Sequence, residues 1–194
     1  MLDLTKIKVG DVLAYKPTGF LGHAIQFFSP GKYAHIGLVY DMATSFEMGG
    51  SVKEAKAQFL PLNEVAKEAS RIDILRVYVG GEWLMDKVEL QKAFQEICKK
   101  REGQPYAFKR IGRYAIGGFV SKIPLVGLLV DWIRTKSVPE REANNQDVCS
   151  DLAAECLEGA IRTESPDFDL VPGIGENRCR PSDLGRCENI VKIC

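Results

Sequence analysis

The alternation of apolar and polar positions divides this chain into short strands and a few helices. Apolar, β-branched or alternating runs predict strands at 9–15, 33–40, 45–48, 51–54, 71–79 and 189–193. Short turn sequences, Asp41 to Thr44 and Gly49-Gly50, separate the strands between 33 and 54. Strands joined by turns this short pair antiparallel as neighbours, so this part is predicted to be a meander.

Apolar residues recur at helical spacing in three places, which are 20–28, 83–100 and 147–159. In the third, Asp147 is the expected N-cap and Gly159 the expected stop. Residues 61–69 are expected to be a helical or looping connector. Strands and helices mixed in this way predict one α+β domain over 1–194, an antiparallel sheet with packed helices.

An apolar insert at about 107–146 interrupts this pattern. Its centre, Ile116 to Ile133, contains Lys122, Pro124 and Asp131. A bilayer span needs about 20 consecutive apolar residues, so a transmembrane helix is not expected. The segment could complete the core as a helical hairpin. It could also be a lid, or an apolar wall for a bulky substrate, and membrane contact through it is not expected.

Composition excludes some classes of function. Lys and Arg number 26, as do Asp and Glu, so no overall field favours nucleic acid or an anionic membrane. The first residues lack the apolar core of a signal peptide, which favours a cytoplasmic protein unless a precursor was trimmed.

Cysteine usage favours reduced thiols. The chain has six cysteines. If one of them is a free nucleophile, five remain, and an odd number cannot all pair within the chain. Cys179, Cys187 and Cys194 could make a disulfide or part of a metal site. No Cys-x-x-Cys pair is present, so neither a metal nor another cofactor is expected.

Cys149 lies in the first turn of the predicted 147–159 helix. There the unpaired backbone N–H groups and the helix dipole favour a thiolate, the form that attacks carbonyls. Of the chain's two histidines, His23 falls in the predicted 20–28 helix and His35 in a β-branched strand that would hold the ring rigidly. We therefore expect His35 to be the base, against the alternative that both residues are structural.

Glu47 is the candidate for orienting the imidazole. If the strand 45–48 pairs with the histidine strand, Glu47 can lie beside His35 on one face, accept the second imidazole N–H and stabilise the imidazolium. The alternative, an exposed strand glutamate, stays open without pairing information.

Six motifs occur in an order that resembles a known family. They are Gly10-Asp11-Val12-Leu13, Ala34-His35-Ile36-Gly37, Glu47, Gly103-Gln104-Pro105-Tyr106, Cys149-Ser150 and Pro181-Ser182-Asp183-Leu184. The chain resembles the circularly permuted branch of the NlpC-type papain-like cysteine peptidases, which includes YiiX-like bacterial proteins and, remotely, lecithin retinol acyltransferase. The resemblance implies a permuted papain-like fold with the nucleophile at a helix N-terminus.

The resemblance also implies roles. Cys149 would be the nucleophile, His35 the base and then the acid, and Glu47 the orienting group. Tyr106 would stabilise the oxyanion together with the backbone N–H of Cys149, or would be a core aromatic residue. The acyltransferases carry a further histidine that is missing after His35 here, which favours the peptidase branch.

The expected function is a cysteine hydrolase that cleaves an amide through a thioester, in a peptidoglycan-derived or related small peptide. A lipid-directed acyl hydrolase or acyltransferase is the alternative favoured by the apolar insert. In a third alternative the fold is an inactive binding module, and Cys149 reacts slowly with alkylating agents.

Overall fold

The computed structural model describes residues 4–18, 32–50, 54–67, 71–79, 82–106, 149–171, 179 and 181–193. Within them the strands are β1 (Val12–Tyr15), β2 (His35–Val39), β3 (Thr44–Gly49), β4 (Lys56–Pro61), β5 (Ile72–Val79), β6 (Glu82–Trp83) and β7 (Ile190–Lys192). They form one seven-stranded sheet in the order β4-β3-β2-β1-β5-β6, with β7 also paired to β5. Each pairing is antiparallel, so the predicted α+β class with an antiparallel sheet is confirmed.

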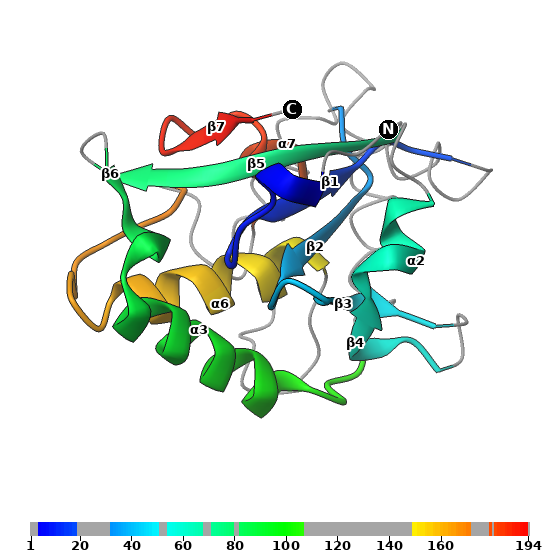
Figure 1. The fold of residues 1–194 in the computed structure, drawn as a ribbon, viewed down its shortest axis with the longest axis horizontal. Helices are drawn as coiled ribbons and strands as arrows, with labels where there is room; N and C mark the ends of the chain where they lie inside the picture. The colour runs from blue at the N-terminus through cyan, green and yellow to red at the C-terminus, as the bar shows by residue number, and fades with distance from the viewer. Residues whose placement is uncertain are drawn as a thin grey trace, which may run out of the picture.

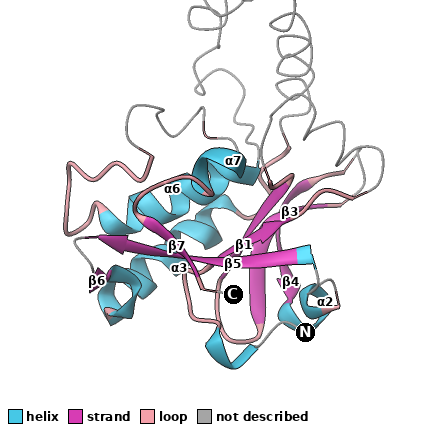
Figure 2. Cartoon of the chain, turned by 90° about the horizontal axis from the view of Figure 1, so that it is seen from above, coloured by secondary structure: helices cyan, strands magenta, loops and turns pink. Residues whose placement is uncertain are grey.

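The helices in the same residues are α2 (Leu62–Ala66), α3 (Val88–Arg101), α6 (Cys149–Ile161) and α7 (Pro181–Leu184), with 3-10 turns η1 (Leu4–Lys6) and η3 (Leu84–Asp86). Figures 1 and 2 show α3 and α6 side by side. Helix α6 also packs on β2 and β3, the strands that carry His35 and Glu47. No helix among the described residues is both long and apolar enough to cross a bilayer.

Alternate side chains along the sheet belong to two apolar clusters on its two faces. Val12 and Ala14 of β1 join the larger cluster, which includes Phe94 of α3 and Leu157 of α6. Their neighbours Leu13 and Tyr15 join a smaller cluster with Leu62 and Val65 of α2. Since successive strand residues face opposite sides, β1 is buried on both faces and anchors the centre of the sheet.

Some predicted boundaries are wrong. The strand predicted at 51–54 does not reach Glu54, which lies in a turn, and the strand begins at Lys56. The helix predicted at 147–159 does not end at Gly159, because α6 continues to Ile161. A Cβ on Gly159 would lie 2.9 Å from Cδ1 of Ile97, so the glycine allows α6 to approach α3.

The other predicted elements divide into those that the structure tests and those that it does not. The strands expected around 9–15, 33–40, 45–48, 71–79 and 189–193 are confirmed, as is the helical connector after Pro61. The amphipathic helix is confirmed from Val88, whereas Trp83 belongs to β6. The helix predicted at 20–28, the insert at 107–146 and the N-cap Asp147 lie outside the described residues.

A buried ion pair holds the turn before β1 against β5. The Arg76 guanidinium donates two hydrogen bonds to the Asp11 carboxylate, at 2.7 and 2.8 Å, and the backbone N–H of Lys8 donates a third. Burial raises the pKa of Asp11, while the hydrogen bonds from Arg76 and Lys8 oppose that rise. The pair ties the turn before β1 to β5, and it explains the acid of the Gly10-Asp11 motif structurally.

We predict that Arg76→Met lowers the free energy of unfolding by about 3–5 kcal/mol, because it leaves a buried carboxylate without its cation. Urea denaturation followed by circular dichroism measures the change. Lys92→Met, on the exposed face of α3, is the control and should change it by less than about 0.5 kcal/mol. Equal stability of the two variants would contradict the importance given to this ion pair.

Candidate active site

His35 and Glu47 are brought together by the register of β2 and β3. Gly37 lies opposite Glu47 in this pairing, and His35 is two residues before Gly37 on the same face. Nε2 of His35 lies 2.8 Å from Oε2 of Glu47. Glu47 is only 5% exposed, so the alternative of an exposed strand glutamate is wrong.

Small and polar neighbours give the Glu47 carboxylate its position. A Cβ on Gly37 would lie 3.2 Å from Oε2 of Glu47, so the glycine leaves room for the carboxylate to reach His35. The hydroxyls of Tyr15 and Ser45 donate to the other oxygen, Oε1, at 3.3 and 3.2 Å. Both carboxylate oxygens are therefore engaged, and the side chain is held in one orientation.

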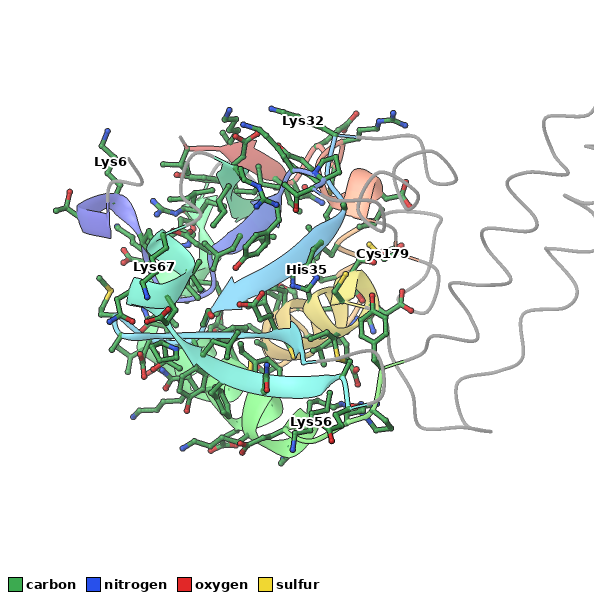
Figure 3. All side chains as sticks on the ribbon, turned by 90° about the vertical axis from the view of Figure 1, so that its right-hand side faces the viewer. Lys6, Lys32, His35, Lys56, Lys67 and Cys179 are labelled. Atoms are coloured by element: carbon green, nitrogen blue, oxygen red, sulfur yellow. The ribbon has the colours of Figure 1, made fainter. Side chains whose placement is uncertain are left out.

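Cys149 is the first residue of α6, at the end of the helix where backbone N–H groups point outward. Its side chain is hydrogen bonded to that of His35. Because Nε2 of His35 engages Glu47, Nδ1 is the nitrogen left for the sulfur. The structure thus brings together Cys149, His35 and Glu47 in this order, and Figure 3 shows His35 beside the beginning of α6.

Tyr106 reaches the sulfur from the segment that follows α3. Gly103, with a φ of 81°, turns the chain away from the helix. Residues 103–106 then run beside the start of β4, with the N–H of Tyr106 donating to the carbonyl of Ala55 at 2.9 Å. The Tyr106 side chain is hydrogen bonded to Cys149. All four predicted site residues therefore meet at one place.

The charges of the site favour a protonated His35. Burial alone would lower the pKa of His35, but the charge and hydrogen bond of the Cys149 thiolate, and then those of Glu47, raise it to about 10. The imidazole is therefore protonated at neutral pH and loses its proton as the pH rises through about 10. Burial and the Cys149 thiolate raise the pKa of Tyr106, which stays a hydrogen-bond donor.

Some contacts of the site were missed by sequence reasoning. Ser150 donates its hydroxyl to the carbonyl of Cys179 at 2.5 Å, which ties the first turn of α6 to the segment before α7. Tyr15 and Ser45 were also missed as partners of Glu47. The spacing of Ser45 and Glu47, two residues apart in one strand, is a signal that could have placed Ser45 on the face of the carboxylate.

The cysteines of the described residues, Cys98, Cys149, Cys156, Cys179 and Cys187, are free thiols. No disulfide joins Cys179 to Cys187. Cys194 lies outside the described residues. The part of the chain that the structure describes contains no group of three His, Cys, Asp or Glu side chains placed to hold a metal ion.

Known proteins resemble this chain in fold. No protein-family model and no curated protein sequence matches it. A crystal structure described as metalloprotein YiiX from Escherichia coli O157:H7, DUF1105, superposes with a TM-score of 0.53 and 16% sequence identity, covering 96% of both chains. The fold is YiiX-like. At this identity the likeness concerns the fold alone.

We predict an order of effects on the pKa of His35. Nuclear magnetic resonance titration of the imidazole should give a midpoint of about 10 in the wild type. Cys149→Ala should lower the midpoint more than Glu47→Gln, because the thiolate raises the pKa more than the carboxylate does.

His23→Gln, which removes the other histidine, assigns the signal to His35 in this titration. A wild-type midpoint near the ordinary value of about 6.5 would contradict the proposed ion pair. A larger shift in Glu47→Gln than in Cys149→Ala would contradict the order.

Proposed function

We propose that this protein is a cysteine hydrolase that cleaves an amide bond through a thioester acyl-enzyme. The observation that carries the proposal is the chain of contacts from Cys149, at the start of α6, through His35 to the buried Glu47. A nucleophile, a base within hydrogen-bond reach and a third group orienting that base are the elements of covalent acyl transfer. The permuted NlpC-type papain-like classification belongs to this proposal, with 1–194 as a single domain.

In the proposed reaction the Cys149 thiolate attacks the amide carbonyl and forms a tetrahedral intermediate. The Tyr106 hydroxyl, held as a donor, and the backbone N–H of Cys149 stabilise its oxyanion. His35 gives its proton to the leaving amine as the C–N bond breaks, which leaves a thioester. His35 then takes a proton from water, which attacks the thioester, releases the acid and regenerates the thiolate–imidazolium pair.

Glu47 acts on this sequence through His35. Its carboxylate holds Nε2, so that Nδ1 stays directed at the sulfur, and it stabilises the imidazolium between the two acyl-transfer steps. The contacts from Tyr15 and Ser45 keep the carboxylate in place. Glu47 is thus a positioning residue, and its replacement should slow the reaction without abolishing it.

Metal binding is a question because the similar YiiX structure is described as a metalloprotein. Here the side chains best suited to bind a metal are directed at each other and not at a common centre, since Nε2 of His35 is hydrogen bonded to Oε2 of Glu47. Within the described ranges no group of three ligating side chains is placed to hold a metal ion. These residues do not fit a metal centre, and the proposed mechanism contains no metal step.

The substrate is proposed to be a small peptide, of the kind derived from peptidoglycan. The second candidate, a lipid-directed acyl hydrolase or acyltransferase, is favoured by the apolar sequence from Ile116 to Ile133, which could accommodate an acyl chain. A panel of short peptides and a panel of acylated lipids, assayed in parallel for release of amine or acid, distinguishes the two.

We predict that Cys149→Ala abolishes turnover of any substrate found in these panels while the protein stays folded, and that Glu47→Gln lowers kcat by about 10- to 1000-fold. Intact-mass spectrometry of quenched wild-type reactions should detect an adduct of the acyl group on Cys149. EDTA should leave the rate unchanged.

Thermal unfolding of each variant is the control for a folding defect. Normal turnover by folded Cys149→Ala would exclude the mechanism. Substrate turnover that requires an added divalent metal would instead favour a metal-dependent activity.

A further inference from the structure

Three lysines converge on one buried carboxylate outside the thiol site. Asp73 of β5 is 3% exposed, and its oxygens lie 3.2 Å from Nζ of Lys16, 2.5 Å from Nζ of Lys32 and 3.1 Å from Nζ of Lys192. The Tyr33 hydroxyl donates to the same carboxylate at 2.8 Å. The lysines come from the ends of β1 and β7 and from the residues before β2, so the fold assembles this lysine cluster from distant parts of the chain.

The lysine cluster carries more positive than negative charge. Three ammonium groups around one carboxylate leave a net charge of about +2, and in the described part of the chain these lysines have no other ion-pair partner. Burial would raise the pKa of Asp73, but hydrogen bonds from Lys32, Tyr33, Lys192 and Lys16 hold it well below its usual range. The carboxylate is therefore charged at neutral pH and holds the ammonium groups together against their repulsion.

The ammonium groups also have unused donors. Each has three N–H bonds, of which one meets Asp73. The lysine side chains are 39%, 54% and 49% exposed, while Asp73 is covered. A solvent-facing set of N–H groups with excess positive charge suits an oxyanion such as a carboxylate or a phosphate.

The lysine cluster is joined to the candidate active site by short stretches of chain. Lys32 is three residues before His35, which limits the distance between their Cα atoms to about 10 Å. Lys16 follows Tyr15, whose ring centroid lies 5.1 Å from that of His35 and whose hydroxyl contacts Glu47. The segments that hold the lysines therefore continue directly into those that hold His35 and its neighbour Tyr15.

We propose that Lys16, Lys32 and Lys192, held by Asp73, form a subsite that binds an anionic carboxylate or phosphate group of the substrate. Anion binding is inferred from the lysine cluster alone, whereas the assignment of that anion to a substrate rests on the proposed function. The subsite selects acyl compounds that carry an anionic group.

The first test measures anion binding without turnover. Inorganic phosphate is titrated into the protein at constant ionic strength, balanced with sodium chloride, while amide signals of residues 32–33 and 72–74 are followed by nuclear magnetic resonance. In the wild type these signals should shift and saturate. In Lys32→Gln, Lys192→Gln the apparent Kd should rise at least about tenfold.

The control is Lys92→Gln, Lys99→Gln, which removes two exposed lysines of α3 and should bind phosphate like the wild type. If the double variant unfolds at a lower temperature than the wild type, the single variant Lys32→Gln replaces it in the test, because Asp73 then keeps its contacts with Lys16, Lys192 and Tyr33. Weak, unsaturable shifts, or equal binding by all proteins, would overturn the subsite.

The second test asks whether the anion belongs to the substrate. An amide substrate with a terminal carboxylate, the same compound as a carboxamide, and a phosphate-bearing analogue are compared. The double variant should raise KM about tenfold for the two anionic compounds, with kcat kept, and leave the carboxamide unaffected.

An equal KM effect on all three compounds would overturn selection of an anionic substrate. Saturable phosphate binding without turnover of any compound would support an anion site and overturn the proposed hydrolase. The compound whose KM rises more in the double variant, the carboxylate or the phosphate, identifies which anionic group the subsite binds.

Discussion

The hydrogen bond between His35 and the buried Glu47 is the interaction on which the candidate site depends. A buried carboxylate is costly unless its charge is balanced by partners. Here the imidazole holds one oxygen at 2.8 Å and two hydroxyls hold the other. The same contact fixes which imidazole nitrogen faces the sulfur. The orientation of the base thus follows from strand pairing, which is rigid, and not from a loop.

The remaining architecture brings the sulfur to this pair. Helix α6 packs on β2 and β3 and lies against α3, with Gly159 permitting the close approach of the two helices. The residues after α3 turn at Gly103 and follow β4, which carries Tyr106 to the same sulfur. The Asp11–Arg76 pair joins β5 to the turn before β1, the strand beside β2. Each of these contacts is remote from the sulfur in sequence, and together they fix its surroundings.

Much of this arrangement followed from the sequence because its causes are local. Alternating apolar residues identified β1, β2, β3 and β5, and the helical spacing after Asp147 placed Cys149 in a first turn. The partners of Glu47 could not be derived in the same way, since they depend on register, which one sequence does not reveal. Gly159 was misassigned because a glycine that permits helix packing and one that ends a helix look alike in sequence. The lysines around Asp73 come from three separate segments, and no pattern along the chain links them.

Iodoacetamide labelling of each cysteine at pH 6, followed by peptide mass mapping, decides whether Cys149 and His35 form an activated pair. Exposure does not distinguish Cys149, at 4%, from Cys179 at 3% and Cys187 at 9%, so a difference in rate reports activation. At this pH an ordinary thiol, with a pKa of about 8.5, is almost entirely protonated. We expect rapid labelling of Cys149 alone and its loss in His35→Ala. Labelling of Cys149 as slow as that of the other thiols, unchanged by His35→Ala, would contradict an activated Cys–His pair.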